Sequence, residues 1–277
     1  MSGFSSAWLS LREAADHRSR NAALAEALAG HFNLRDSVTI TDIGCGTGSN
    51  LRATAALLPA RQIWTLVDYD PALLSTAKDE LGNWADEARI EGEDLQLIKG
   101  LAKIQVSFRK ADLAADLDAG LGAPSDLITA AAFFDLASKA FIREFAQAVA
   151  ARRAVFYTVL TYNGRCSWQP RHPADNAVTA AFQRHQMTDK GFGISVGPTA
   201  PLYLSDQFKL ADYSVQEADS PWILGPRDEM LLAEVQAGHL KAVSEVGAVE
   251  PSALDSWASR KLTGAVIGHT DTLAIPT

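Results

Sequence analysis

The sequence predicts an α/β fold: a doubly wound, mostly parallel sheet of about seven strands with helices on both faces. Three observations lead to this prediction. Short apolar segments alternate with stretches of helical periodicity, as expected for a sheet covered on both sides. A glycine-rich turn at residues 44–48 directly follows the first apolar segment, and the second segment ends in Asp68. N-terminal helices and a lid-like insertion after the fifth strand complete the expected architecture.

The chain divides into four parts with different patterns. Residues 1–37 form a predicted helical cap, and residues 38–161 hold five strand–helix units. We interpret residues 162–212 as a lid or substrate segment. Residues 213–277 are expected to complete the sheet with strands that have two helices inserted between them.

The composition is that of an ordinary globular protein, with 47% apolar and 21% charged residues. The N-terminus lacks a basic segment followed by an apolar core, so we expect no signal peptide and a cytoplasmic protein. The net charge of −8 argues against a surface that wraps a phosphate backbone. We therefore expect no nucleic acid as partner, although the charge leaves room for a local basic groove. No apolar run approaches the ~18–20 residues that span a bilayer, so we expect no membrane partner either. The sequence does not indicate an oligomeric state.

Cysteine and histidine usage gives no sign of a metal site. Cys45 and Cys166 are too few for a four-thiolate zinc site or a disulfide framework. The six histidines form no HxH or HxxxH pair, so we predict no structural metal.

The N-terminal cap is alanine-rich and predicted to be helical, with a break near residues 16–19 and an end near Gly30. Its apolar side chains form one predicted stripe, made of Trp8, Leu9, Leu11, Leu24 and Leu28.

The first unit, at residues 38–50, is a strand, a glycine turn and the start of a helix. The strand is rich in β-branched residues and closes with Asp42. Glycines then follow at every second position, namely Gly44, Gly46 and Gly48. Glycine permits positive φ and lets a ligand lie against bare backbone. Ser49 or Asn50 is a natural cap for the helix.

The order Asp42-x-Gly44-x-Gly46-x-Gly48 resembles the first motif of class I S-adenosylmethionine-dependent methyltransferases, an acidic residue followed by GxGxG. A dinucleotide fingerprint, GxGxxG, has its third glycine one residue later, which disfavours a nicotinamide dehydrogenase. The resemblance implies S-adenosylmethionine as cofactor, with its amino-acid end over Asp42, Cys45 and the three glycines. The alternative is a turn needed only for packing of the strand against the helix.

The second strand, at residues 62–68, ends in Asp68. Because Asp70 and Pro71 are natural first residues of the next helix, Asp68 has no structural task of its own in this reading. An acidic residue at about this distance from the first strand accepts hydrogen bonds from ribose hydroxyls, and the resemblance implies the same role. Tyr69 is either a stacking partner for adenine or simply a half-exposed tyrosine.

The helix after Pro71 is predicted to reach Ala88, and residues 94–98 are either a short strand or a loop. The third strand covers residues 103–109. The resemblance implies that Asp112 binds the adenine amino group and that the backbone N–H of Leu113 meets a ring nitrogen. Asp116 and Asp118 compete with Asp112 for this role.

The fourth strand, at residues 126–131, ends in a tip formed by residues 132–135, next to the end of the first strand. Ser138 is predicted to cap the following helix. The resemblance places the transferable methyl group near this tip, where Phe133 or Phe134 faces the sulfonium. Asp135 is a candidate base or acceptor of a substrate hydrogen bond, or else a helix cap. The tip lacks the polar-Pro-Pro-aromatic tetrad of many nucleic-acid amino-methyltransferases.

The segment after the fifth strand (residues 154–161) is where we expect the substrate to bind. It has one predicted helix, at residues 174–187, and a glycine turn at residues 188–193. We predict that at least two of eight polar or aromatic residues touch substrate: Tyr162, Asn163, Arg165, Trp168, His172, His185, Gln186 and Lys190.

Candidate catalytic residues are Asp135, Tyr162 and His185. Candidate substrate contacts are Asn163, Arg165, Trp168, Gln186 and Lys190. A buried structural histidine is an equal reading of His185, and a solvated side chain is the simpler reading of Lys190.

In the C-terminal part, strands are predicted at residues 213–218 and 265–275. Helices are predicted at residues 226–246 and from Pro251 to Gly264. The two inserted helices depart from the usual β-hairpin end of the resembled family. In that family, N-terminal helices often cover the cofactor, and Arg12, Arg18 or Arg20 would then meet its carboxylate. The simpler reading is that these arginines are solvated.

The resemblance and the acidic composition predict a methyltransferase that acts on a small molecule by direct in-line transfer. Such a reaction needs alignment and exclusion of water, and a base only where the nucleophile must lose a proton. The alternatives are a protein or RNA methyltransferase, or a protein that binds S-adenosylmethionine without turnover.

Overall fold

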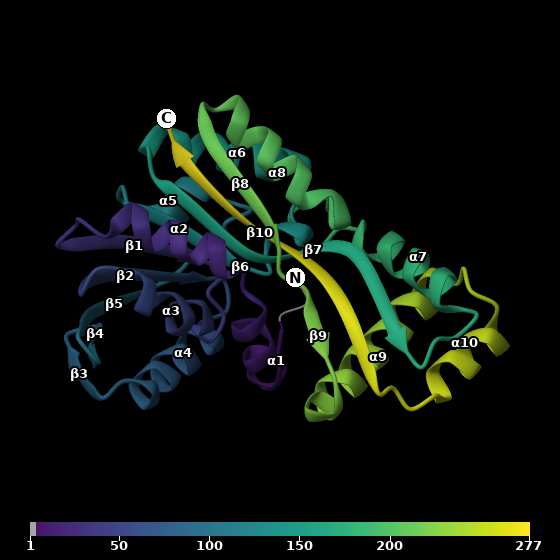
Figure 1. The fold of residues 1–277 in the computed structure, drawn as a ribbon. Coiled ribbons are helices and arrows are strands. Elements are labelled where there is room, and N and C mark those ends of the chain that lie inside the picture. The colour runs from purple at the N-terminus through teal and green to yellow at the C-terminus, as the bar shows by residue number, and fades with distance from the viewer. Residues whose placement is uncertain (1–3) are drawn as a thin grey trace.

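The computed structural model describes residues 4–277, which form one mixed sheet with helices on both faces (Figure 1). Within these residues the strand order is β3-β4-β5-β2-β1-β6-β7-β10-β8, and β9 pairs with β10. Five central strands are parallel: β5 (Ala102–Lys110), β2 (Arg61–Asp68), β1 (Ser37–Ile43), β6 (Leu127–Ala131) and β7 (Val155–Gln169). The others pair antiparallel: β3 (Glu87–Glu91), β4 (Asp94–Lys99), β8 (Tyr213–Asp219), β9 (Trp222–Leu224) and β10 (Gly264–Pro276).

The predicted doubly wound α/β core is confirmed, but the sheet is larger and less parallel than expected. A β3–β4 hairpin extends one edge, and β10 with β8 extends the other in antiparallel pairing. The predicted helix after Pro71 therefore ends at Trp84, because residues 87–91 pair as a strand with residues 94–98.

Helices cover both faces of the sheet and bury two apolar clusters. One cluster lies under α2 (Ala22–Phe32), α3 (Ser49–Thr54) and α4 (Pro71–Trp84). The other lies under α5 (Leu117–Leu121), α6 (Lys139–Arg152) and α8 (Ala200–Leu210). Helix α4 buries Leu74, Ala77 and Leu81 against the sheet, and Ser138 caps α6 as predicted.

Strands β7 and β10 run past the other strands and carry a second group of helices (Figure 1). These helices are α7 (Asp175–Gln186), α9 (Glu229–Val246) and α10 (Pro251–Ser259). Trp168, near the end of β7, is fully buried and contacts the rings of Trp257 and His239 at centroid distances of 5.3 and 4.8 Å. We call this part, built on the distal halves of β7 and β10, the annex.

Most of residues 162–212, which were predicted to form a lid, belong instead to regular secondary structure. Residues 162–169 continue β7, and α8 (200–210), which the sequence analysis missed, packs Leu204 and Phe208 into the core. The segment between α7 and α8 has the irregular backbone expected of a loop over the site.

Where it is described, the predicted N-terminal cap is mainly helical, and residues 1–3 lie outside the described residues. It consists of α1 (Ser6–Ser19) and α2, with the break at Arg20 and Asn21 rather than at residues 16–19. Asn21 caps α2 by accepting a hydrogen bond from the Leu24 N–H, and α2 continues through Gly30. Helix α1 lies between the core and the annex (Figure 1).

Among residues 4–277, no helix is both long and apolar enough to cross a membrane.

Candidate active site

A cavity of about 450 Å³ opens at the carboxyl ends of the central parallel strands. This is the edge where open α/β sheets hold ligands. The residues that follow β1, β2, β5 and β6 form its floor, and α1 forms its roof. We call it the first cavity; its lining includes Leu9, Arg12, Arg20, Gly44, Cys45, Gly46, Asp68, Tyr69, Ala111, Leu113, Phe133, Lys190 and Phe192.

The glycine turn adopts the positive φ values that its spacing predicts, +60° at Gly44, +54° at Gly46 and +77° at Gly48. A Cβ on Gly44 would lie 2.6 Å from the Phe133 ring, and one on Gly46 would lie 3.0 Å from Leu9 of α1. The missing side chains therefore let a phenylalanine ring and the roof helix approach the backbone. Gly48 itself occupies the N-cap position of α3 and lies outside the cavity lining.

Ser49 and Asn50 do not cap α3, contrary to prediction, because both side chains have other partners. Asn50 Nδ2 donates to Asp42 Oδ1 at 2.7 Å, and Ser49 Oγ contacts His17. Asp42 is fully buried behind the turn, where burial raises the pKa of its carboxyl to about 7. Because Asp42 does not line the cavity, its placement supports a role in holding α3 rather than the predicted direct contact with the cofactor.

Asp68 lies on the cavity wall, as predicted, but it also has a structural task. Its Oδ2 accepts the Gly46 N–H at 2.9 Å and its Oδ1 accepts the Asp70 N–H at 3.0 Å, so it pins the glycine turn to the end of β2. Burial raises the pKa of this carboxyl, against the hydrogen bonds that lower it. Tyr69 also lines the cavity and is 51% exposed.

The predicted adenine-binding pair is only half in place. Leu113 lines the first cavity, whereas Asp112 does not. The Asp112 Oδ1 instead accepts the N–H of Ala114 at 3.0 Å, which closes a local turn after β5.

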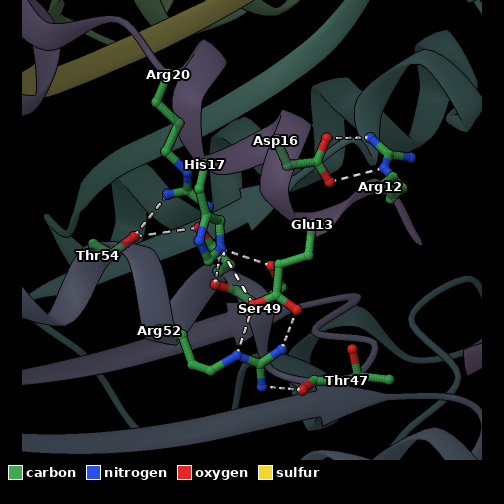
Figure 2. A network of polar contacts seen from close by, with 10 residues as sticks. Arg12, Glu13, Asp16, His17, Arg20, Thr47, Ser49, Arg52 and Thr54 are labelled. Atoms are coloured by element: carbon green, nitrogen blue, oxygen red, sulfur yellow. Dashed lines mark hydrogen bonds and ion pairs between the residues drawn. The ribbon is translucent and has the colours of Figure 1, made fainter. Parts of the chain in front are cut away.

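Helix α1 is tied to the glycine turn and to α3 by a network of polar contacts (Figure 2). Glu13 accepts from both Nε and Nη2 of Arg52 at 2.8 and 2.6 Å, while Nη1 of Arg52 donates to the Thr47 carbonyl at 2.8 Å. His17 Nε2 lies 2.9 Å from Ser49 Oγ, and Arg20 donates to Thr54 at 3.0 Å. Burial raises the pKa of the Glu13 carboxyl, but the contacts with Arg52, together with His17 and Ser49, lower that pKa overall.

The N-terminal arginines are therefore not simply solvated. Arg12 and Arg20 line the first cavity, and Arg12 also forms a two-bond ion pair with Asp16 at 2.8 and 3.1 Å. Arg18 points elsewhere and pairs with Asp228 at 2.6 Å.

A second cavity, of about 610 Å³, adjoins the first. Both cavities share part of their lining, which we call the shared wall: Phe4, Arg12, Ala132, Leu136, Leu160 and Lys190. Ala132 and Leu160 have φ values of 51° and 60°, uncommon for residues with a side chain. Such backbone conformations persist where the surroundings fix them, and they cluster at functional sites. Here the Leu160 N–H donates to the buried carboxylate of Asp271 at 2.8 Å.

Asp135 lies in the second cavity and is 7% exposed. Burial raises the pKa of its carboxyl to about 6. Tyr162 lines the same cavity, with its hydroxyl 3.4 Å from Cys166 Sγ. Because burial also raises the pKa of the Tyr162 hydroxyl far above neutrality, the phenol stays protonated. Asp135 is thus better suited than Tyr162 to accept a proton.

The other predicted catalytic and substrate residues fall into two groups. His185, Gln186 and Lys190 line the second cavity. Asn163, Arg165 and Trp168 line neither cavity, because the segment that holds them is strand rather than lid. Asn163 donates to Thr270, Arg165 pairs with Asp219 and Trp168 lies in the annex core. His172 contacts Ser256 of α10.

Two buried histidines of the second cavity were missed by the sequence analysis. His239 Nδ1 donates to the Val235 carbonyl at 2.8 Å, so its Nε2 keeps a lone pair, and this atom has no partner among the described residues. His269 Nδ1 is likewise without a partner there. Burial lowers their pKa values to about 4 and about 3, so both rings are neutral at pH 7. The spacing of His239 from Val235 and Val243 would have placed it on the buried stripe of α9.

Among residues 4–277, no group of three or more His, Cys, Asp or Glu side chains is arranged to hold a metal ion.

Comparison with solved structures identifies the fold. The chain is similar to the YcgJ protein of Bacillus subtilis, at 14% identity and a TM-score of 0.53, over 94% of this chain and 98% of that one. It is also similar to a cyclopropane-fatty-acyl-phospholipid synthase-like protein from Lactobacillus casei, at 15% identity and a TM-score of 0.56, over 96% and 92%. The chain has the fold of the class I S-adenosylmethionine-dependent methyltransferases that its first motif resembles. No family model and no curated protein matches the sequence.

The network in Figure 2 predicts that Arg52 holds the roof of the first cavity in place. Replacing Arg52 with Met removes the ion pair to Glu13 and the bond to Thr47. Since hydrogen bonds of charged groups contribute ~1.5–3 kcal/mol, amide exchange in α1 should accelerate by about tenfold or more. The measurement is hydrogen exchange read by mass spectrometry.

The matched control is Lys261→Met, which breaks an exposed ion pair with Glu229 outside the cavities. It should leave α1 exchange unchanged. Unaltered α1 exchange in the Arg52 variant would show that the network does not hold the roof.

Proposed function

We propose that the protein is an S-adenosylmethionine-dependent methyltransferase that acts on a small molecule. The first cavity holds the cofactor and the second cavity holds the methyl acceptor. The observation that carries this proposal is the shared wall: a cavity floored by the glycine turn and Asp68 continues into one that contains buried acid–base groups. A cofactor in the first cavity and an acceptor in the second would therefore approach each other where these shared residues lie.

The residues of the first cavity fit the cofactor. Its volume of about 450 Å³ is in the range of small-molecule sites. Gly44 and Gly46 present bare backbone to the cavity beneath α1. Each Asp68 oxygen accepts one backbone N–H, and an ionised carboxylate has about four acceptor positions, so it retains room for two ribose hydroxyls. Tyr69 and Leu113 border the space for the adenine ring, and Arg20 lies at the end toward α1.

When bound, S-adenosylmethionine supplies an activated methyl group on a positively charged sulfur. The chain's own contribution is to align the acceptor and to exclude water. Phe133 presents its ring to the first cavity, held by contacts with Phe141 and Phe192 at centroid distances of 5.9 and 5.3 Å. A ring face there favours a nearby cation. Helix α1 covers the opposite side, so the reacting groups are screened from solvent.

Asp135 is the residue best placed to take a proton from the acceptor. It follows Ala132 at the tip of β6, borders the shared wall and is ionised above pH 6. A carboxylate in this state accepts the proton that a hydroxyl or amine loses as it attacks. No intermediate bonded to the protein is required.

We further propose a cytoplasmic protein whose acceptor is neither a nucleic acid nor membrane-bound. The net charge of −8 disfavours a polyanion. The second cavity, about 610 Å³ in volume, has the size of a small-molecule site.

Calorimetric titration tests the cofactor half of the proposal. S-adenosylmethionine and S-adenosylhomocysteine should bind with micromolar affinity, and NAD should not bind. Asp68→Ala should weaken binding by about tenfold or more, since it removes two charge-assisted hydrogen bonds. Tyr69→Phe is the matched control on the same wall and should bind almost normally. A folded protein that binds neither sulfur nucleoside would refute the proposal.

The pH dependence of turnover tests Asp135. With an acceptor found by screening phenols, amines and thiols, activity should rise through pH 6 and level off above it, because the base must be ionised. Asp135→Asn should remove this inflection and lower kcat by about 10²- to 10⁴-fold.

Stability serves as the control for Asp135→Asn. The folded pKa of about 6 exceeds the ordinary value of 3.8, so ionising Asp135 costs stability as pH rises from about 4 to above 6. The Asn variant should therefore be no less stable than wild type at pH 8. An unchanged pH profile in this variant would assign the base to another group.

A further inference from the structure

Three titratable side chains form a chain that leads from the surface of α9 to the shared wall. Glu245 Oε2 lies 3.0 Å from His185 Nε2, and His185 Nδ1 lies 3.4 Å from Lys190 Nζ. Lys190 in turn lines both cavities. These residues come from α9, from α7 and from the turn after α7. Neither the cofactor nor the proton transfer proposed above uses them.

The hydrogen-bond roles along this chain follow from its two ends. A carboxylate only accepts, so His185 Nε2 is the donor to Glu245. An ammonium only donates, so His185 Nδ1 is the acceptor from Lys190. The imidazole therefore orients the ammonium without neutralising its charge. Burial lowers the pKa of Lys190, and the more distant Glu245 opposes this.

The two cations of the shared wall, Lys190 and Arg12, differ in whether a carboxylate neutralises them. Arg12 has a two-bond ion pair with Asp16, and its guanidinium also covers the Trp222 ring at 4.8 Å. Within the described residues no carboxylate forms an ion pair with Lys190. Glu245, at the other end of the chain, pairs with His185 instead. Lys190 thus presents a partly desolvated positive charge to the cavities, where an anion would compensate the cost of burial.

Aromatic side chains line part of the second cavity, beside charged side chains that include Asp135, Glu234 and Lys241. Trp8, Tyr162, Phe182 and Trp222 line it, together with Val235 and Ile267. Tyr162 and Phe182 meet edge to face at a centroid distance of 5.8 Å. Such walls favour a planar, largely apolar molecule.

We propose that Lys190 binds an anionic group of the methyl acceptor, and that the acceptor is a small planar acid, such as an aromatic carboxylate. This inference rests on the proposed function, because it takes the second cavity as the acceptor site. The acid group lies at Lys190 on the shared wall, and the ring lies among the aromatic side chains.

A pair of fluorescent probes of nearly equal shape tests the inference. 2-Naphthoate carries the charge, and 2-naphthamide is its neutral counterpart. Both are titrated into the full-length protein at saturating S-adenosylhomocysteine and again without it. Wild type should bind the naphthoate about tenfold more tightly than the amide, the effect of one charge-assisted contact. Lys190→Met should reduce this preference to less than about twofold.

Arg184→Met is the matched control, because Arg184 is an exposed cation on α7 beside His185 and lies outside both cavity linings. It removes the same charge and should keep the tenfold preference. Circular dichroism and the affinity for S-adenosylhomocysteine report whether each variant is folded.

Each remaining outcome is decisive. No detectable binding of 2-naphthoate to wild type at millimolar concentration, or equal binding of both probes, would overturn the inference. So would a preference that survives Lys190→Met. If Lys190→Met weakens S-adenosylhomocysteine instead, Lys190 belongs to the cofactor site. If S-adenosylhomocysteine does not bind, the proposed function is refuted. That outcome is distinguishable from failure of this inference, because the probe preference is also measured without S-adenosylhomocysteine.

Discussion

The contact on which the site depends is the packing of α1 on the glycine turn. Gly44 and Gly46 place no side chain between the turn and its neighbours, and a Cβ at position 46 would lie 3.0 Å from Leu9 of α1. The ion pair between Glu13 and Arg52 fixes this approach, and Arg52 also holds the Thr47 carbonyl of the turn itself. One arginine therefore joins the floor of the first cavity to its roof.

The second cavity arises from a different constraint, the length of β7 and β10. Both strands continue beyond the end of β6, so the sheet carries α7 and α9 past the edge of the core. The space between this annex and α1 becomes a cavity beside the cofactor site instead of open surface. The annex therefore positions His185 and His239 opposite residues of the core such as Asp135.

Local sequence signals predicted the core because each of its elements has its own signature. The alternation around residues 38–131 and the caps at Asp70 and Ser138 appear in the structure almost as predicted. Long-range pairing has no such signature. Residues 162–169 are polar enough to suggest a loop. Pairing with β10 makes them part of a strand and places the Trp168 side chain in the core of the annex. For the same reason, the importance of Arg52 depends on a helix 39 residues earlier in the chain.

A crystal structure with S-adenosylhomocysteine is the most direct test of the central claim that α1 and the glycine turn enclose the cofactor beside the acceptor cavity. We predict the ribose hydroxyls at Asp68, the amino-acid end between the glycine turn and α1, and the sulfur facing the shared wall near Ala132 and Leu160. A ligand bound outside the first cavity, or one whose sulfur faces away from that wall, would contradict the account.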